Sequence, residues 1–176
     1  ATNFYDSNLA EKEIRDYYKS IKIKTDKPVW YGLNSKVVKG NDGKIIEKVW
    51  HAEGMYGSAI KEIMGWLEKA AGVAENEKQA KALLLLIEYY RTGDLKTWDA
   101  YNIAWVEATD GDIDYINGFI EVYNDPIGYK GSYESIVEIK DFEASKQMKV
   151  MADNAQWFED NSTIAEEHKK KKVVGI

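Results

Sequence analysis

The sequence predicts an α+β fold that is mostly helical, with a β-hairpin and a further strand forming part of a barrel-like sheet packed by helices. Three observations support this prediction. Apolar residues recur at three- and four-residue spacing over 55–108, which is typical of helices with one buried face. Asp42-Gly43 separates two runs rich in β-branched and aromatic residues within 31–50, the pattern of a hairpin. Ile, Phe, Tyr and Val crowd 112–124 and predict a strand.

The segment 1–30 is predicted to contain an N-terminal helix and a linker. Asp6-Ser7-Asn8 are good capping residues for a helix from Leu9 to Ile21. Thr25-Asp26-Lys27-Pro28 should end it, because proline disfavours helical geometry at the preceding residue.

Within 55–108 the capping signals divide the helical pattern into three helices. Asn76 with Gln79 resembles a capping box that opens the second helix. Gly93 suits the end of that helix, and Asp94 can cap the third. Short joints between helices imply antiparallel packing.

After the strand, Ser132 is expected to cap a long helix over 132–160. Ile136, Ile139, Met148 and Met151 would form its buried stripe. A solvated tail with a short lysine run is expected over 161–176.

Composition excludes several classes of function. The chain has 24 basic and 30 acidic residues, a net charge of −6, which disfavours a nucleic-acid partner. Cysteine is absent, so neither a disulfide framework nor a cysteine nucleophile is available. No apolar run approaches the length of a membrane span, so we expect no membrane partner. A cytoplasmic location is favoured, although no signal fixes the compartment.

The ionisable residues offer little self-contained chemistry. Only two histidines occur, His51 and His168, and their spacing forms no zinc-binding pair. We therefore expect no bound metal and no catalytic residue in this chain. Asp110, Asp112 and Asp114 could serve a carboxylate-based hydrolase, but an acidic turn before a strand explains the same residues.

The predicted strand has two different faces. Alternation places Tyr115, Asn117 and Glu121 on one face with Phe119 and Tyr123, while mostly aliphatic residues occupy the other. An outer face with a tyrosine, an amide and a carboxylate could hold an extended peptide by hydrogen bonds. An ordinary solvent-exposed sheet would carry the same pattern.

Several blocks together resemble the dipeptidyl peptidase III family of zinc exopeptidases, which remove dipeptides from the N-terminus of short peptides. The most specific block is Gly118-Phe119-Ile120-Glu121 with Tyr123, Asp125-Pro126, Gly128, Gly131 and Glu134. Further support comes from Tyr31-Gly32-Leu33-Asn34-Ser35-Lys36, Ala74-Glu75-Asn76-Glu77, Thr92-Gly93-Asp94-Leu95 and Ala155-Gln156-Trp157-Phe158-Glu159-Asp160.

The resemblance implies a two-lobed parent enzyme whose substrate-binding lobe contains a five-stranded barrel. The stretch 1–176 would be a single fragment of that lobe. It implies short peptide substrates that lie along a barrel strand, with Tyr115, Asn117, Gly118 and Glu121 as substrate-binding candidates. The family has a tyrosine two residues before the glycine of the Gly-Phe block. Here that position is Ile116, and a one-residue offset reverses the face of a strand.

The resemblance also implies zinc in the parent, held by a His-Glu-x-x-x-His helix in a catalytic lobe that this sequence does not contain. The isolated fragment is therefore expected to be inactive and to depend on that lobe as its partner. The alternative is a stand-alone protein- or peptide-binding α+β module without catalysis.

Overall fold

The computed structural model describes residues 3–22 and 29–173 and divides the chain into two compact units, Ala1–Val137 and Glu138–Ile176. The expected helix break at Thr25-Asp26-Lys27-Pro28 lies outside the described residues. None of the described helices is both long enough and apolar enough to cross a membrane.

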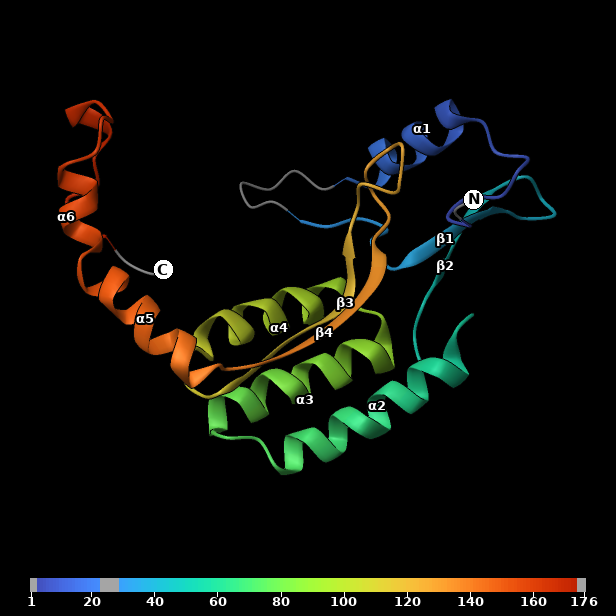
Figure 1. The fold of residues 1–176 in the computed structure, drawn as a ribbon. Coiled ribbons are helices and arrows are strands. Elements are labelled where there is room, and N and C mark those ends of the chain that lie inside the picture. Colours follow the sequence, from blue (N-terminus) through green and yellow to red (C-terminus); the bar gives the residue numbers. More distant parts are fainter. Residues whose placement is uncertain (1–2, 23–28, 174–176) are drawn as a thin grey trace. The chain divides into compact units, whose positions relative to one another are not determined.

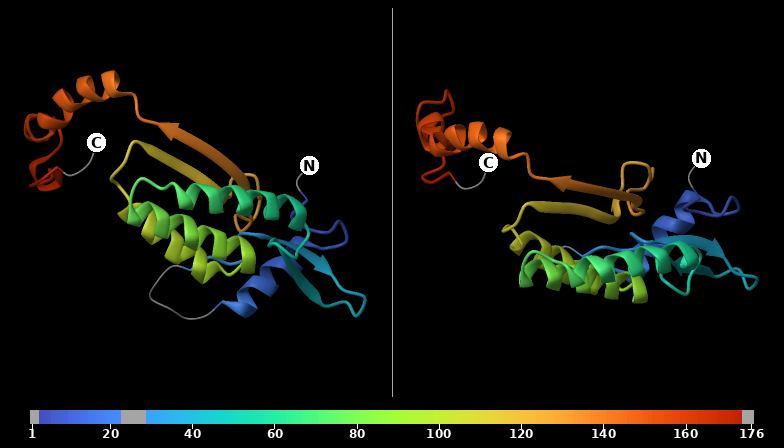
Figure 2. Two further views of the ribbon diagram at one scale, coloured as in Figure 1. Left: turned by 90° about the horizontal axis from the view of Figure 1, so that it is seen from below. Right: turned by 60° about the horizontal axis from the view of Figure 1, so that its bottom comes forward.

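The first unit is built on a layer of three helices, α2 (Gly57–Gly72), α3 (Glu77–Thr92) and α4 (Leu95–Glu107). Strands β3 (Ile113–Glu121) and β4 (Ser132–Ile139) form a two-stranded sheet on one face of this layer (Figures 1 and 2). The helix α1 (Glu11–Ile21) and the hairpin of β1 (Ser35–Lys39) and β2 (Ile45–Val49) lie at one end of the layer (Figure 2). The α+β prediction is confirmed, and the described strands close no barrel.

The capping signals between the helices act largely as predicted. The Asn76 side chain accepts a hydrogen bond from the Gln79 amide, and the Asp94 carboxylate accepts one from the Thr97 amide. Gly93 ends α3 in the left-handed conformation, with a φ of 73°. Gln79 does not complete the capping box, because its side-chain oxygen accepts from the Glu75 amide instead of the Asn76 amide.

The start of α1 differs from the expectation. Ala10, rather than a residue of Asp6-Ser7-Asn8, occupies the N-cap, and the Glu13 carboxylate accepts from the Ala10 amide at 2.9 Å. A carboxylate in the first helical turn can satisfy an orphan amide without help from the cap residue. Ile14 and Tyr18 provide the buried face of α1.

The hairpin forms as expected, with antiparallel register that pairs Ser35 with Val49 and Lys39 with Ile45. Its turn includes Gly43 at a φ of 78°, a conformation that glycine adopts without strain.

The long helix predicted over 132–160 is wrong. Residues Ser132–Ile139 form β4, and a shorter helix, α5 (Phe142–Asp153), begins only after them. The Asp141 carboxylate caps α5 by accepting from the Glu143 and Ala144 amides, each at 3.0 Å. Apolar residues spaced by three, Ile136 and Ile139, gave the helical pattern, but β-branched residues pairing with β3 favour a strand.

An aromatic core holds the sheet to the helices. Trp50 and Phe119 pack with ring centroids 4.8 Å apart, and Tyr89 packs on Trp98 at 4.9 Å. Tyr90 is fully buried beside them. Burying large aromatic side chains supplies much of the stabilisation of such a layer.

The second unit comprises α5, α6 (Ala155–Asp160) and a short 3-10 helix (Glu166–His168). Both α5 and α6 lack buried residues, so the stripe expected from Met148 and Met151 is exposed within this unit. Lys169 departs from the expected solvated lysine run, because its ammonium group donates to the Asp160 carbonyl at 2.7 Å and pairs with Glu166.

Candidate functional site

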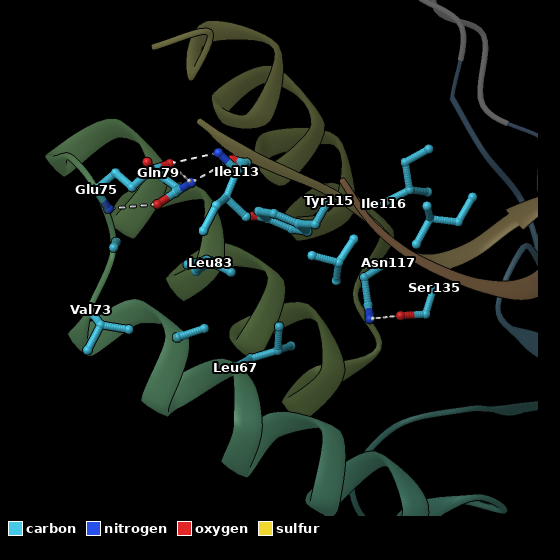
Figure 3. Close-up of a pocket in the computed structure, with 14 residues that line it drawn as sticks. Leu67, Val73, Glu75, Gln79, Leu83, Ile113, Tyr115, Ile116, Asn117 and Ser135 are labelled. Carbon is cyan, nitrogen blue, oxygen red and sulfur yellow. Dashed lines mark hydrogen bonds between the residues drawn. The ribbon is translucent and has the colours of Figure 1, made fainter. Parts of the chain in front are cut away.

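The start of β3 is anchored by the segment that precedes α3. The Glu75 carboxylate accepts from the Ile113 amide at 3.0 Å, and the Gln79 side chain donates to the Ile113 carbonyl at 3.0 Å (Figure 3). The same carboxylate accepts from the Asp112 amide, at 3.0 Å for the shorter contact. A carboxylate receiving several backbone amides fixes a turn firmly. The strand therefore leaves the turn in a defined direction over α3.

Tyr115 faces the helix layer. Its ring packs against the core cluster, and no group of the described chain is placed to hydrogen-bond its enclosed hydroxyl with normal geometry. Burial is the main cause that raises the Tyr115 pKa to about 12, with the Tyr101 hydroxyl as a polar neighbour that lowers it. This tyrosine stays protonated at neutral pH.

Asn117 is a junction between α3 and the two strands. Its side-chain oxygen accepts from the Tyr90 hydroxyl, and its nitrogen donates to the Ser135 hydroxyl at 3.1 Å and the Tyr133 hydroxyl at 3.3 Å. Three partners leave the amide little freedom to rotate, so it is held in one orientation.

The face with Tyr115, Asn117 and Phe119 was expected to point outward, and this is wrong. Phe119 is 6% exposed and belongs to the core together with Trp50 and Tyr90. Tyr115 and Phe119 pack against the core cluster of aromatic side chains, and burying these large rings favours the inward direction.

The other two candidates lie further along the strand. Gly118 packs so closely on Trp98 that a Cβ there would fall 2.5 Å from the indole ring. Glu121 is half-buried at the end of β3, and its carboxylate has no hydrogen-bond or ion-pair partner within the described part of the chain.

A cavity of about 210 Å³ lies between the β3–β4 sheet and helices α2 and α3 (Figure 3). Tyr115 and Asn117 both line it, whereas Gly118 and Glu121 do not. The rest of its wall consists of apolar side chains with a few polar groups: Leu67, Ala70, Val73, Ala74, Glu75, Gln79, Leu83, Ile113, Ile116, Ser135, Ile136 and Val137.

One long edge of β3 has no strand partner among the described residues. β3 pairs only with β4, in a sheet of two strands, so its second edge presents backbone amides and carbonyls. Such an edge can accept an extended chain by main-chain hydrogen bonding.

The acidic residues before and in β3 have structural partners. Asp110 pairs with Lys78 at 3.4 Å, and Asp114 accepts from the Trp105 indole at 3.0 Å and from the Tyr115 amide at 2.7 Å. These contacts explain both carboxylates as turn and strand anchors.

The side chains present do not fit a zinc site. Within residues 3–22 and 29–173 no group of three or more His, Cys, Asp or Glu side chains is arranged to hold a metal. The His51 ring nitrogen Nδ1 accepts from the Glu53 amide at 3.3 Å, so His51 acts in a local turn.

Comparison with known proteins identifies the family. A model of peptidase family M49 matches residues 6–170. The chain belongs to peptidase family M49.

Individual relatives agree with this family. Dipeptidyl peptidase 3 of Homo sapiens is 29% identical over 86 residues, 49% of this chain and 12% of that protein. Nudix hydrolase 3 of Arabidopsis thaliana is 28% identical over 120 residues, 68% of this chain and 15% of that protein. The solved structure of DPP III from Caldithrix abyssi has the same fold, with a TM-score of 0.72, 24% identity, and coverage of 97% of this chain and 31% of that one.

The chain spans only a small part of the length of these relatives, 12% and 15% of the two curated proteins. Sequence reasoning missed Glu75 as the anchor of β3. The available signal was the position of Glu75 directly before Asn76, the residue that caps α3. From this position the Glu75 carboxylate accepts a hydrogen bond from the Asp112 amide.

Proposed function

We propose that this chain supplies a peptide-binding strand, β3, to a zinc dipeptidyl peptidase of family M49. The observation that carries the proposal is the unpaired edge of β3 within the stretch that matches the family. An extended peptide would add to this edge through main-chain hydrogen bonds, which suit substrates of varied sequence.

The four candidate residues take different parts in this proposal. Asn117 keeps the strand rigid through its three side-chain partners, and Tyr115 supports it from the helix side. Gly118 lets the backbone settle on Trp98. Glu121 offers an unpartnered carboxylate that would attract a cationic group of the peptide, such as its N-terminal ammonium.

In this proposal, another part of the parent enzyme supplies the metal chemistry. Zinc there would be held by residues outside this chain, and the peptide would bridge β3 and that catalytic lobe. Since the described side chains hold no metal group, the fragment alone should hydrolyse no peptide, with or without added zinc.

Backbone-modified peptides test the proposal in the full-length enzyme. Pairing with a strand edge uses the amides of alternate residues, so N-methylation at one set of positions should weaken inhibition by a short peptide at least tenfold. N-methylation at the intervening positions should change it less than threefold. Equal effects at all positions would contradict strand addition.

A variant pair locates the effect on β3. Asn117→Ala should raise KM for a dipeptide-releasing substrate about tenfold, because the strand loses its brace to Tyr90 and β4. Asn161→Ala, which removes a side-chain bond to the Trp157 carbonyl in the second unit, is the control and should leave KM within twofold. An unchanged KM for Asn117→Ala would count against the role of β3.

A further inference from the structure

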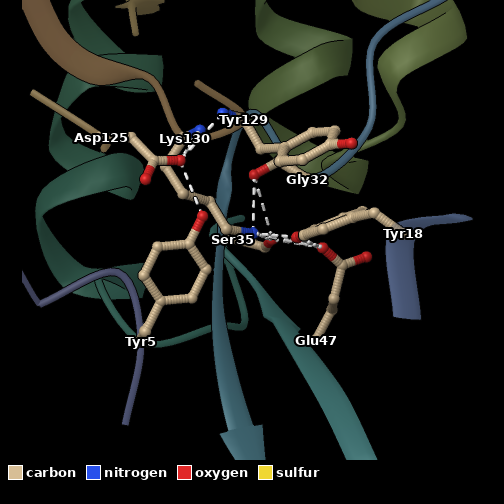
Figure 4. A network of polar contacts seen from close by, with 8 residues as sticks. All are labelled: Tyr5, Tyr18, Gly32, Ser35, Glu47, Asp125, Tyr129 and Lys130. Atoms are coloured by element: carbon tan, nitrogen blue, oxygen red, sulfur yellow. Dashed lines mark hydrogen bonds and ion pairs between the residues drawn. The ribbon is translucent and has the colours of Figure 1, made fainter. Parts of the chain in front are cut away.

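Lys130 is a fully buried lysine that lies just before β4 and outside the proposed peptide-binding strand β3. Its exposed fraction is 0%, and its ammonium group donates to Gly32 O at 2.9 Å, Ser35 Oγ at 2.7 Å and the Tyr18 hydroxyl (Figure 4). Glu47 Oε1 lies 3.2 Å away and supplies the counter-charge. The ammonium group has more acceptors around it than it has protons.

Such a group is costly to bury unless it is held well. Burial lowers the Lys130 pKa to about 8, and the Glu47 carboxylate opposes that shift. Buried ion pairs gain little net stability over an apolar pair, but removing one partner leaves the other uncompensated. Net stability by itself therefore does not account for a buried lysine at this position.

The contacts of Lys130 join parts of the chain that are distant in sequence. Tyr18 lies on α1, Gly32 and Ser35 precede and begin β1, and Glu47 lies on β2. Lys130 lies in the connection between β3 and β4. The ammonium group therefore ties this connection to the hairpin and to α1.

A second anchor holds the same connection internally. The Asp125 carboxylate is buried and accepts from the backbone amides of Tyr129 and Lys130 at 2.8 and 2.9 Å and from the Tyr5 hydroxyl at 2.7 Å (Figure 4). It also accepts from the Ile127 amide at 3.0 Å. The ring of Tyr129 stacks on Tyr18 with centroids 4.2 Å apart. Several internal contacts thus hold the connection in one conformation, and Lys130 attaches it to the hairpin.

We propose that Lys130 is a positioning residue for the β3 edge, an inference that rests on the proposed peptide-binding function. The next residue, Gly131, donates to the Leu33 carbonyl at 2.7 Å and lies against the backbone of Phe119 in β3. A displacement of the connection is therefore transmitted to β3. Displacements of about 1 Å are enough to cost large factors in substrate use.

Kinetics of the full-length enzyme test this role. Lys130→Met removes the donor but keeps a long apolar side chain, and it should raise KM at least fivefold with kcat within twofold. Lys39→Met is the matched control: it removes the 2.7 Å ion pair between β1 and Glu13 of α1 without touching the connection, and both constants should stay within twofold. A folded Lys130→Met enzyme with wild-type KM would overturn the proposal.

Glu47→Gln decides the question if Lys130→Met does not fold. This change removes the counter-charge but keeps the side-chain shape, and it should raise KM about threefold with kcat unchanged; a wild-type KM would equally overturn the role of Lys130. The experiments distinguish a failure of the peptide-binding proposal from a failure of the positioning role. If N-methylated peptides show the alternating effect and both network variants keep wild-type KM, only the positioning role is lost.

Discussion

Gly131 lies against the backbone of Phe119, so that a Cβ on Gly131 would fall 2.7 Å from the Phe119 carbonyl carbon and 2.8 Å from its oxygen. A real Cβ does not approach backbone atoms so closely, and backbone cannot move aside as a flexible side chain can. The first residue after the Lys130 anchor thus has to be glycine for the connection to settle on β3.

Gly131→Ala is therefore expected to lower the free energy of unfolding by about 2 kcal/mol, through strain from overpacking. Gly65→Ala in α2 is the control, because a Cβ there meets nothing within 4 Å. That change should be neutral or stabilise by up to about 1 kcal/mol, as alanine favours helices more than glycine. Urea denaturation of both variants measures the contrast, and equal stabilities would contradict the close approach.

Gly32→Ala should lower the free energy of unfolding by more than the strain of a left-handed backbone conformation alone would cause. Gly32 has a φ of 65°, and a Cβ there would fall 2.1 Å from the Tyr18 hydroxyl and 2.6 Å from both the Glu47 carboxylate and the Lys130 ammonium group. Gly43 has a φ of 78° with open space around it, so Gly43→Ala measures the left-handed strain alone, about 1 kcal/mol. Thermal unfolding should place Gly32→Ala at least about 2 kcal/mol below Gly43→Ala; similar losses would argue against a tight Lys130 site.

Local signals predicted much of the helix layer. Asn76, Gly93 and Asp94 act at the predicted helix ends, because a cap depends on a side chain and backbone groups only a few residues away. The hairpin turn was predictable for the same reason, since Asp42-Gly43 fixes it locally.

Tertiary contacts decided what the sequence pattern could not. The segment of Ile136 and Ile139 fits a helical spacing as well as an alternating one, and pairing with β3 selects the strand. The inward direction of Tyr115 and Phe119 depends on aromatic partners from α3 and α4. Likewise, nothing in the local sequence indicates that Lys130 would meet Glu47, which lies 83 residues away.

The pKa of Lys130 predicts how stability depends on pH. The folded pKa of about 8 lies below the ordinary value of 10.5, so between these values the unfolded chain binds more protons. The contribution of Lys130 to the free energy of unfolding should therefore grow as pH increases above 8, and it is lost again as pH falls through 8. Burial raises the pKa of the Tyr5 and Tyr18 hydroxyls in the folded chain, so these tyrosines ionise first in the unfolded chain, at about pH 10, and lower the free energy of unfolding there. The contribution of Lys130 is therefore clearest between about pH 8 and 9.

Urea denaturation at pH 7.5, 8.5 and 9 measures this dependence, below the range in which the tyrosines of the unfolded chain ionise. Lys130→Met should lack the rise that the wild-type chain shows, whereas Lys39→Met, which alters a partly exposed lysine, should keep it. The same pH dependence in all three proteins would show that Lys130 keeps an ordinary pKa.

Removing the Asp125 side chain should lower the free energy of unfolding more than removing any one of its hydrogen-bond partners. Asp125→Ala leaves three buried or half-buried backbone amides without their acceptor, and it should cost about 3 kcal/mol of unfolding free energy. Tyr5→Phe removes only the hydroxyl that donates to Asp125 at 2.7 Å and should cost about 1 kcal/mol. Combining the two changes should cost less than the sum, because the hydroxyl bond is already lost in Asp125→Ala. Chemical denaturation of the two single variants and the double variant measures this coupling, and strictly additive losses would mean that Tyr5 and Asp125 do not interact.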